Sequence, residues 1–429
     1  MTGSVALVIF LTLIVCLVLT VPIGFSLGIA SLAYILYTKQ LTFGFIAQNL
    51  VTGCDSFPIM AIPFFVFAGE LMGGGGISRR LLNVASVFFG RIRGGLAIVT
   101  VVVCMFFAAI SGSGPATVAA VGGMVVPTML QKGYDKKFVL ALIAAAGSIG
   151  VIIPPSIPMV VYSVTTNSSV SKLFLAGFVP GIFIGVVLCL YSYFYARSHG
   201  YKGDDEPFSA KRALKEVKDS FWALLSPVII LGGIYGGIFT PTEAAAVSVI
   251  YSLVIGCLVY KELDLKQLGT VTKNACETTA TILIVIGCAA GFSKVLTLGR
   301  IPTTVATFLT TMTDSKILIL LLINVLLLIV GCFMETLCAI MILAPILFPV
   351  VTALGVDVTH FGIIMVVNLA IGFITPPLGV NLFVASRVGE TTLDTVIKGI
   401  IPFLALMIVI LLFITYVPAI SMFLPNMLG

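Results

Sequence analysis

Charged residues are scarce in this chain of 429 residues. Asp, Glu, Lys and Arg make up only 9% of it, whereas soluble globular domains carry roughly 25%. Hydrophobic residues account for 59%, and the mean hydropathy is +1.21. A water-soluble fold of this size needs far more polar surface than these residues supply. The composition therefore excludes a soluble enzyme, a nucleic-acid-binding protein and a disordered protein.

Residues that support catalysis or metal binding are also few. The two histidines, His199 and His360, are too few for a zinc site or a Ser-His-Asp triad. The nine cysteines include no C-x-x-C pair, and we interpret them as structural thiols rather than redox groups or metal ligands. No G-x-x-x-x-G-K-[ST] phosphate loop is present, so ATP hydrolysis by this chain has no support. We expect a protein that is not an enzyme.

The chain contains instead a series of long apolar stretches. Each is close to the roughly 20 residues that cross a bilayer as an α-helix. The net charge of +6 comes from Lys and Arg residues that concentrate in a few polar connecting segments. This pattern predicts an all-α, polytopic protein that lies in the lipid bilayer along most of its length.

The sequence contains an internal repeat with an offset of 222 residues, the spacing between Pro154-Pro155 and Pro376-Pro377. Without a gap, the same offset matches further Gly, Pro and Asp positions: Gly69 and Gly291, Pro127 and Pro349, Gly133 and Gly355, Asp135 and Asp357, Gly150 and Gly372, Gly177 and Gly399, Pro180 and Pro402. Gly and Pro recur because they fix backbone geometry, while the apolar residues between them are free to change. We predict two homologous repeats, 1–196 and 219–429, joined by a polar cytoplasmic connector at 197–218.

The distribution of Lys and Arg predicts that the two repeats are inverted. Basic residues concentrate on the cytoplasmic side of membrane proteins, and the connector holds six of them. Residues 132–137 include three lysines, whereas the equivalent residues 354–359 include none. The amphipathic segment 79–93 carries four arginines, and its counterpart near 300–314 carries only Arg300. Opposite membrane faces explain these differences, as in the inverted repeats of many secondary transporters.

Two apolar segments are too short and too interrupted to cross the membrane. Residues 94–130 are flanked by basic residues and contain Ser111-Gly112-Ser113-Gly114-Pro115, which interrupts a helix. Each half has about 17 residues and reaches about 25 Å, short of the roughly 30 Å hydrocarbon core. We predict a re-entrant hairpin at about 94–130 and a second at about 316–352, with its turn near 331–336. The hairpins enter from opposite faces, so their tips are expected to meet near the middle of the membrane.

Two transmembrane helices are predicted to be broken, at 150–155 and at 372–377. Proline removes an intrahelical hydrogen bond and frees a carbonyl about one turn earlier. Irregular backbone at membrane depth is tolerated only where protein surrounds it or where it lines a water-filled cavity. Freed carbonyls and nearby hydroxyls suit sodium, and helix N-termini suit an anion. One hairpin and one broken helix in each repeat therefore predict two ion sites.

Some of these residues have a second interpretation. Ser111 and Ser113 are candidate ligands, and they are alternatively small residues that allow close helix packing. Glu335, in the turn of the second hairpin, is a candidate functional carboxylate or a solvated group on the periplasmic side. Arg300 is either an interfacial anchor or a contact for an anionic substrate or partner.

Six stretches of the sequence resemble the large membrane subunit of tripartite ATP-independent periplasmic (TRAP) transporters. They are SGSGPATVAAVG at 111–122, GYDKKF at 133–138, GSIGVIIPPSIPMVVYS at 147–163, FTPTEAAAV at 239–247, METLCAIMILAPILFPV at 334–350 and NLAIGFITPPLGVNLFVAS at 368–386. The resemblance covers nearly the whole chain. It implies a multi-pass protein of the bacterial inner membrane that imports carboxylate-bearing solutes with sodium by an elevator mechanism. Hairpins and broken helices would move against a scaffold that includes arm helices at 78–93 and 300–314.

The resemblance also implies partners. A soluble periplasmic substrate-binding protein would deliver the substrate, and a small four-helix membrane subunit would be a separate chain, because residue 1 begins directly with the large subunit. The substrate would be an organic acid: a C4-dicarboxylate, a sialic acid or another sugar acid. The alternative is a stand-alone sodium–carboxylate symporter that needs no binding protein.

By the same resemblance, two sodium ions would serve as coupling ions. The first site would use Ser111, Ser113, Gly150, Ile153 and Pro154. The second site would use Gly331, Gly372, Thr375 and Leu378. The substrate would bind between the hairpin tips, with the candidate contacts Ser113, Ser156, Glu335 and Arg300. Relatives often carry Asp at the position of Glu335, which keeps the charge but changes its reach.

Overall fold

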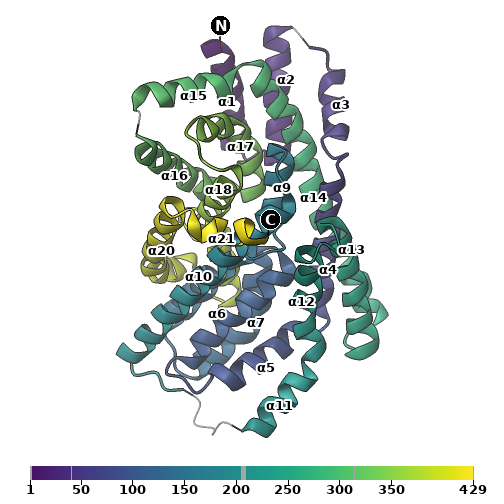
Figure 1. Cartoon of the computed structure of the whole chain (residues 1–429), viewed down its shortest axis with the longest axis vertical. Helices are drawn as coiled ribbons and strands as arrows, with labels where there is room; N and C mark the ends of the chain where they lie inside the picture. Colours follow the sequence, from purple (N-terminus) through teal and green to yellow (C-terminus); the bar gives the residue numbers. More distant parts are fainter. Residues whose placement is uncertain (1, 40, 204–208, 314, 429) are drawn as a thin grey trace.

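The computed structural model describes residues 2–39, 41–203, 209–313 and 315–428, and every regular element within these ranges is a helix (Figure 1). In the first half the α-helices are α1 (Thr2–Val18), α2 (Ile23–Thr38), α3 (Gly44–Thr52), α4 (Ala61–Gly74), α5 (Ile77–Phe89), α6 (Gly95–Ser111), α7 (Gly114–Gln131), α8 (Lys136–Ser148), α9 (Ile157–Thr166) and α10 (Val170–Ser198). In the second half they are α11 (Ala210–Asp219), α12 (Phe221–Tyr235), α13 (Pro241–Leu253), α14 (Leu265–Leu298), α15 (Ile301–Met312), α16 (Lys316–Phe333), α17 (Thr336–Ala353), α18 (Val358–Gly372), α19 (Val380–Val388), α20 (Leu393–Tyr416) and α21 (Ala419–Leu428). Short 3-10 and π-helical turns are present at Phe57–Met60, Ile149–Val151 and Val254–Val259. The predicted all-α fold is confirmed.

Several helices have the length and composition of membrane spans. Seven of the described helices are long and apolar enough to cross a membrane, or eight if the bent pair α11 and α12 counts as one span. Large apolar side chains such as Leu190, Phe194 and Ile401 face outward from them. Lipid tails accept such a surface, whereas water does not. The prediction of a polytopic membrane protein is confirmed.

The internal repeat is visible in the order of the helices. Helices α6 to α10 correspond, at the offset of 222 residues, to helices α16 to α20. Asp135 and Asp357 begin α8 and α18 in the same way. Their carboxylates accept hydrogen bonds from the backbone N–H groups of Lys137 at 3.2 Å and Thr359 at 2.8 Å. Matched N-caps make the chain start the same helix after each hairpin.

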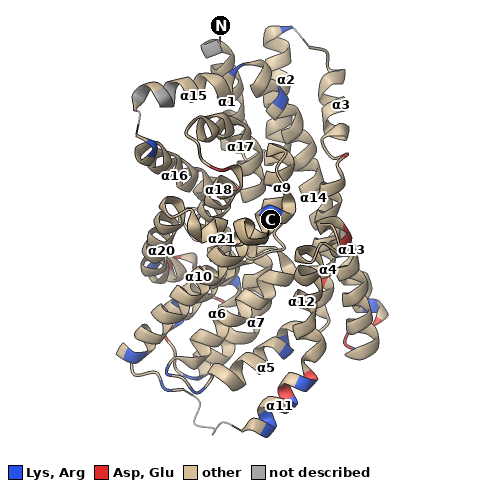
Figure 2. Ribbon diagram, in the orientation of Figure 1, with Lys and Arg blue, Asp and Glu red and all other residues tan. Residues whose placement is uncertain are grey.

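The two hairpins lie at opposite ends of the molecule. Helices α6 and α7, with α5 before them, lie in the lower part of Figure 1, and α16 and α17, with α15 before them, lie in the upper part. Figure 2 shows that Lys and Arg gather at the lower end, most clearly on α11. This excess of basic residues assigns the lower end to the cytoplasm. The predicted inversion of the repeats is confirmed.

Each repeat completes the core of the other. Helix α9, after the first break, packs on α17 of the second hairpin, and α19, after the second break, packs on α7 of the first. Tyr162 on α9 donates a hydrogen bond to the carbonyl of Val358 at 2.9 Å. Asn381 on α19 donates to the carbonyl of Ala144 at 3.0 Å. The hairpins and broken helices therefore form one packed group.

A second group of helices packs around the long helix α14. Helices α2, α3 and α4 contact α14, and α13 packs on α4. Each arm helix contacts both groups: α5 contacts α6 and α4, and α15 contacts α17 and α14. The fold thus divides into a hairpin group, a group around α14 and two arms that join them.

Three features of the structure go beyond the sequence prediction. The connector predicted at 197–218 contains α11, which meets α12 at an angle of 59°, and residues 204–208 of this connector lie outside the described residues. Helix α3 has only nine residues, so it is too short to cross the membrane. The last transmembrane helix ends at Tyr416 because Pro418 cannot continue it, and α21 follows.

Candidate functional site

The tip of the first hairpin brings three oxygen atoms together. Helix α6 ends at Ser111, Gly112 adopts a left-handed φ of 60°, and Ser113 is the N-cap residue of α7. Ser111 Oγ lies 3.2 Å from Thr117 Oγ1. Thr117 in turn donates a hydrogen bond to the carbonyl of Ser113 at 2.7 Å. Two hydroxyls and one carbonyl therefore converge at membrane depth.

The break in the first broken helix lies directly against this tip. Helix α8 ends in the 3-10 turn Ile149–Val151, so the regular hydrogen-bond ladder stops there. A methyl group at Gly150 would lie 2.6 Å from the carbonyl oxygen of Ser113 and 2.6 Å from Thr117 Oγ1. Only glycine allows the two backbones to approach this closely. The structure thus brings Gly150 against the tip of the first hairpin.

The second repeat makes the equivalent contact with other residues. Gly331, near the end of α16, packs against Gly372 at the end of α18, and a methyl group at Gly372 would lie 2.5 Å from the carbonyl oxygen of Gly331. About one turn after Gly372, the hydroxyl of Thr375 donates a hydrogen bond to the carbonyl of Ile371 at 2.8 Å. A cis Pro-Pro bond follows each break. The structure therefore brings Gly331, Gly372 and Thr375 together.

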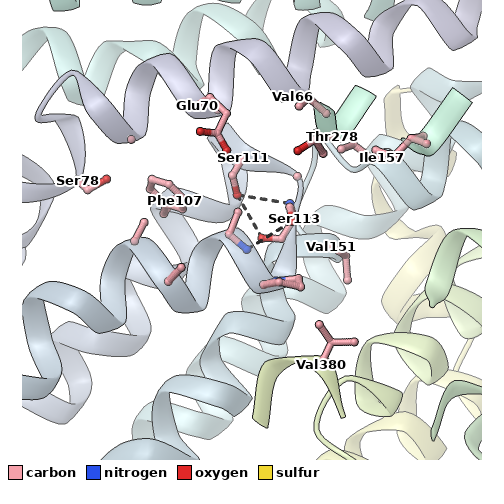
Figure 3. Close-up of a pocket in the computed structure, with 18 of the residues that line it drawn as sticks. Val66, Glu70, Ser78, Phe107, Ser111, Ser113, Val151, Ile157, Thr278 and Val380 are labelled. Atoms are coloured by element: carbon pink, nitrogen blue, oxygen red, sulfur yellow. Dashed lines mark hydrogen bonds between the residues drawn. The ribbon is translucent and has the colours of Figure 1, made fainter. Parts of the chain in front are cut away.

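A cavity of ≈ 950 Å³ lies between the two hairpin tips. Its lining comes from both hairpins, from both broken helices and from α4, α5 and α14, and it includes Glu70, Ser111, Ser113, Val151, Ile157, Thr278, Glu335, Thr336, Phe373 and Val380. In Figure 3, the Ser111 and Ser113 side chains lie between Glu70 of α4 and Val380 of α19. The two hairpin tips share one cavity, as their predicted geometry requires.

Glu335 reaches the cavity from the second hairpin. It is the N-cap residue of α17, and its side chain is exposed to the cavity. The Cys338 thiol donates a hydrogen bond to Glu335 Oε2 at 3.6 Å. The partial positive charge of a helix N-terminus stabilises a carboxylate at this position.

Only Ser111, Ser113 and Glu335 of the predicted contacts belong to the described lining of the cavity. The other nine lie outside it: Gly150, Ile153, Pro154, Ser156, Arg300, Gly331, Gly372, Thr375 and Leu378. Ser156 is fully buried as the N-cap residue of α9, and its hydroxyl donates to the carbonyl of Val151 at 2.6 Å. Arg300 is an exposed residue that precedes α15. Leu378 lies in the segment between α18 and α19 and is 45% exposed. In this geometry Ser156 is a helix cap, and Arg300 lies apart from the described lining of the cavity.

The structure also adds residues that the sequence analysis did not select. Glu70 and Thr336 line the cavity, and the Thr336 hydroxyl is buried without a hydrogen-bond partner within the described residues. Glu70 could have been predicted from the sequence, because a carboxylate inside an apolar span usually has a functional role. The spacing of one helical turn after Ser113 was a signal for Thr117. Phe373 is apolar and gave no such signal.

The cavity offers oxygen atoms and helix N-termini. Within the described ranges, no group of three or more His, Cys, Asp or Glu side chains could hold a metal ion. Hydroxyl and carbonyl oxygens suit a hard monovalent cation such as sodium. Helices α7 and α17 both begin at the cavity, where each N-terminus carries about half a positive charge. The arrangement is suited to cations and an anion that bind side by side.

Two inverted repeats, each with a re-entrant hairpin and a broken helix at a shared cavity, define a membrane transporter rather than an enzyme. Residues 10–420 match the family model of the tripartite ATP-independent periplasmic transporter, DctM component. The chain belongs to this family, as its resemblance to TRAP large subunits predicted. It is a multi-pass protein of the bacterial inner membrane.

Three relatives are similar along most of the chain. It is 53% identical over 407 residues to the isethionate TRAP transporter permease protein DctMQ of Oleidesulfovibrio alaskensis, which covers 95% of this chain and 64% of that protein. It is 44% identical over 404 residues to the C4-dicarboxylate TRAP transporter large permease protein DctM of Pseudomonas aeruginosa, with 94% of each chain covered. It is 38% identical over 406 residues to the sialic acid TRAP transporter large permease protein SiaM of Vibrio cholerae, with 95% of each chain covered. The chain thus spans less than two thirds of the length of the isethionate relative.

The fold is similar to that of a solved transporter. The YdaH transporter of Alcanivorax borkumensis superposes with a TM-score of 0.58 at 16% identity, covering 88% of this chain and 87% of that one. At this identity the likeness concerns the fold alone.

Proposed function

We propose that this chain imports an organic acid across the inner membrane together with sodium ions, by an elevator mechanism. The observation that carries the proposal is the contact between hairpin and broken helix in each repeat. Ser113 meets Gly150 in the first repeat, and Gly331 meets Gly372 in the second. Both contacts border irregular backbone whose carbonyl oxygens are available at membrane depth.

Two sodium ions would bind at these two contacts. The first would use the Ser111 hydroxyl and the Ser113 carbonyl, with Gly150, Ile153 and Pro154 from the break. The second would use Gly331, Gly372, Thr375 and Leu378. The sodium ions are co-transported substrates, so each site must bind its ion and also release it. Neutral oxygen ligands suit that requirement better than several carboxylates, because they bind a monovalent cation less tightly.

The substrate acid group would bind between the tips. The N-termini of α7 and α17 begin there, and both favour an anion. The relatives are named for isethionate, C4-dicarboxylates and sialic acid, which share an acidic group. Glu335 adds a negative charge beside that group. Glu335 therefore repels the substrate anion until sodium ions are bound nearby. Because the anion binds favourably mainly after sodium has bound, substrate binding is coupled to sodium binding.

The division of the helices supports an elevator movement. The hairpins and broken helices pack as one group, and the helices around α14 pack as another. The arm helices α5 and α15 join the groups. A rigid movement of the hairpin group would carry both hairpin–break contacts across the membrane with few new contacts inside the group, while the α4 and α14 part of the cavity lining stays behind.

The proposed partners follow from the family. The relatives are named as permeases of tripartite transporters. We expect a soluble periplasmic protein to deliver the substrate and a small four-helix membrane subunit to complete the transporter.

The energy available from two sodium ions is sufficient. With one monoanion they carry a net charge of +1. A tenfold sodium gradient contributes about 1.4 kcal/mol per ion. A membrane potential of 100 mV adds about 2.3 kcal/mol for the net charge. The total of about 5 kcal/mol corresponds to accumulation of several thousandfold.

The test is uptake by proteoliposomes that contain this chain, its small membrane subunit and its binding protein. Isethionate, succinate and N-acetylneuraminate are offered with an inward sodium gradient or with choline in its place. We expect at least one acid to accumulate only with sodium. Equal uptake in choline would overturn sodium coupling. Uptake without the binding protein would instead favour the stand-alone symporter.

A further inference from the structure

The cavity extends from the hairpin tips to the N-terminus of the arm helix α5, near the cytoplasmic end of the molecule. Gly76, Ser78 and Arg79 line this part of it, together with Glu262 from the segment between α13 and α14. Helix α5 begins at Ile77, so its first backbone N–H groups have no intrahelical acceptors. We call the part of the cavity lined by Gly76, Ser78, Arg79 and Glu262 its inner mouth. The inner mouth therefore carries the partial positive charge of a helix N-terminus.

The hydroxyl of Ser78 is a second feature that points to a ligand at this place. Ser78 is 4% exposed, and its Oγ has no hydrogen-bond partner among the described residues. Figure 3 shows this oxygen turned toward Phe107, which lines the same cavity. A buried hydroxyl without a partner is unfavourable. An oxyanion bound at the start of α5 would accept its hydrogen bond.

A carboxylate of the protein itself now occupies the inner mouth. Glu262 Oε1 accepts hydrogen bonds from Arg79 Nη2 and from Arg80 Nη1, both at 2.7 Å. Glu262 Oε2 lies over Gly76, where any side chain would overlap it. The two arginine side chains of the first turn of α5 thus bind an oxyanion in this structure, the Glu262 carboxylate.

The two arginines differ in how firmly they are held. The Arg80 guanidinium lies 3.5 Å from the centroid of the Tyr260 ring and donates to the carbonyl of Gly76 at 3.0 Å. The Arg80 side chain is only 19% exposed, whereas that of Arg79 is 63% exposed. Arg79 is therefore the group that can exchange Glu262 for another oxyanion while Arg80 stays in place. The two arginine side chains share the single carboxylate of Glu262.

We propose that Ser78, Arg79 and the N-terminus of α5 form a second anion-binding site, which holds the acid group of the substrate as it leaves for the cytoplasm. The occupant is a carboxylate or sulfonate that displaces Glu262 from Arg79. This inference rests on the proposed function, because it takes an organic acid as the cargo. Glu262 competes with that acid for Arg79, so binding at the mouth is weak and release into the cytoplasm is favoured.

The experiment measures binding to the purified transporter in choline buffer without sodium, by calorimetry. The probes are isethionate, succinate, N-acetylneuraminate and inorganic phosphate. Glu262→Gln removes the competing carboxylate and should tighten binding of an organic acid by about tenfold. Arg79→Gln should abolish that binding, and the double variant should lose the gain. Arg91→Gln, at the same end but outside the described lining, is the matched control and should change nothing.

Ser113→Ala separates this site from the one at the hairpin tips. It should abolish sodium-driven uptake while leaving sodium-free binding at Arg79 unchanged. Equal sodium-free binding by the unaltered protein, Glu262→Gln and Arg79→Gln would overturn the mouth site and leave the proposed function standing. If Glu262→Gln tightens sodium-free binding and Arg79→Gln abolishes it, while uptake does not depend on sodium, the mouth site stands and the proposed sodium coupling is overturned. Binding of phosphate but of no organic acid would also overturn the proposal.

Discussion

Ser113 and Glu335 occupy equivalent positions in the two repeats and line the same cavity. They are 222 residues apart, and each is the N-cap residue of the second helix of its hairpin, α7 or α17. The inversion of the repeats brings one sequence position to the cavity from both membrane faces. One side therefore supplies a neutral hydroxyl and the other a carboxylate. The two sides of the cavity therefore differ in charge, which two identical residues would not produce.

Removal of either group should abolish transport. We expect Ser113→Ala and Glu335→Ala each to lower sodium-dependent uptake by more than about tenfold, because each removes a polar group from the cavity shared by both tips. The measurement is initial uptake in proteoliposomes, with the amount of folded protein followed by size-exclusion chromatography.

Thr128→Ala is the control for these variants. Thr128 lies on α7, where its hydroxyl only bonds back to the carbonyl of Met124 at 3.2 Å on the exposed face. It should transport normally. Normal uptake in both Ser113→Ala and Glu335→Ala would show that the assigned site is wrong.

A methyl group at Gly150 should weaken sodium binding more than folding. It would lie 2.6 Å from both the Ser113 carbonyl oxygen and Thr117 Oγ1, so the break must move away from the hairpin tip. We expect Gly150→Ala to raise the sodium concentration for half-maximal uptake by about tenfold. Gly123→Ala is the matched control, because a Cβ at Gly123 meets no described atom within 4 Å. Unchanged sodium dependence in Gly150→Ala would remove this contact from the ion site.

The sequence contained the positions of the hairpins and breaks because those features depend on local chemistry. Gly112 and the Pro-Pro pairs interrupt helices wherever they are placed. Asp135 and Asp357 begin helices through bonds to backbone only two residues away. The repeat provides a second copy of each Gly and Pro pattern at a fixed offset. Each hairpin could therefore be located from two copies of the pattern, to within a few residues.

The contacts between distant segments could not be predicted in the same way. Arg79 and Glu262 are 183 positions apart, and nothing in either segment specifies the other. Phe373 lines the cavity only because the second broken helix packs against the first hairpin. Ser156 is a comparable case, because a serine beside a helix break suits a ligand. In the structure Ser156 is buried, and its hydroxyl caps α9 by accepting a hydrogen bond from the backbone N–H of Met159 at 3.4 Å. Tertiary packing decides between two roles that the same residue type can fill.

Substitution of Arg300 should leave substrate transport unchanged. Arg300 is exposed before α15 and lies outside the described lining of the cavity. We expect Arg300→Gln to change the substrate concentration for half-maximal uptake by less than about twofold. A larger change, measured with all three components present, would assign Arg300 a contact with the substrate or with a partner.

The opposite orientation of the repeats can be tested with two equivalent exposed residues, Gln131 at the end of α7 and Ala353 at the end of α17. Each is replaced by Cys in a variant without the native cysteines, and a membrane-impermeant maleimide is applied to intact spheroplasts and to inside-out vesicles. We expect Gln131→Cys to react only in inside-out vesicles, because the Lys-rich end is cytoplasmic. Ala353→Cys should react only in spheroplasts. Labelling of both residues from one side would make the repeats parallel, and two hairpins that enter from the same face could not bring Ser113 and Glu335 to one cavity from opposite directions.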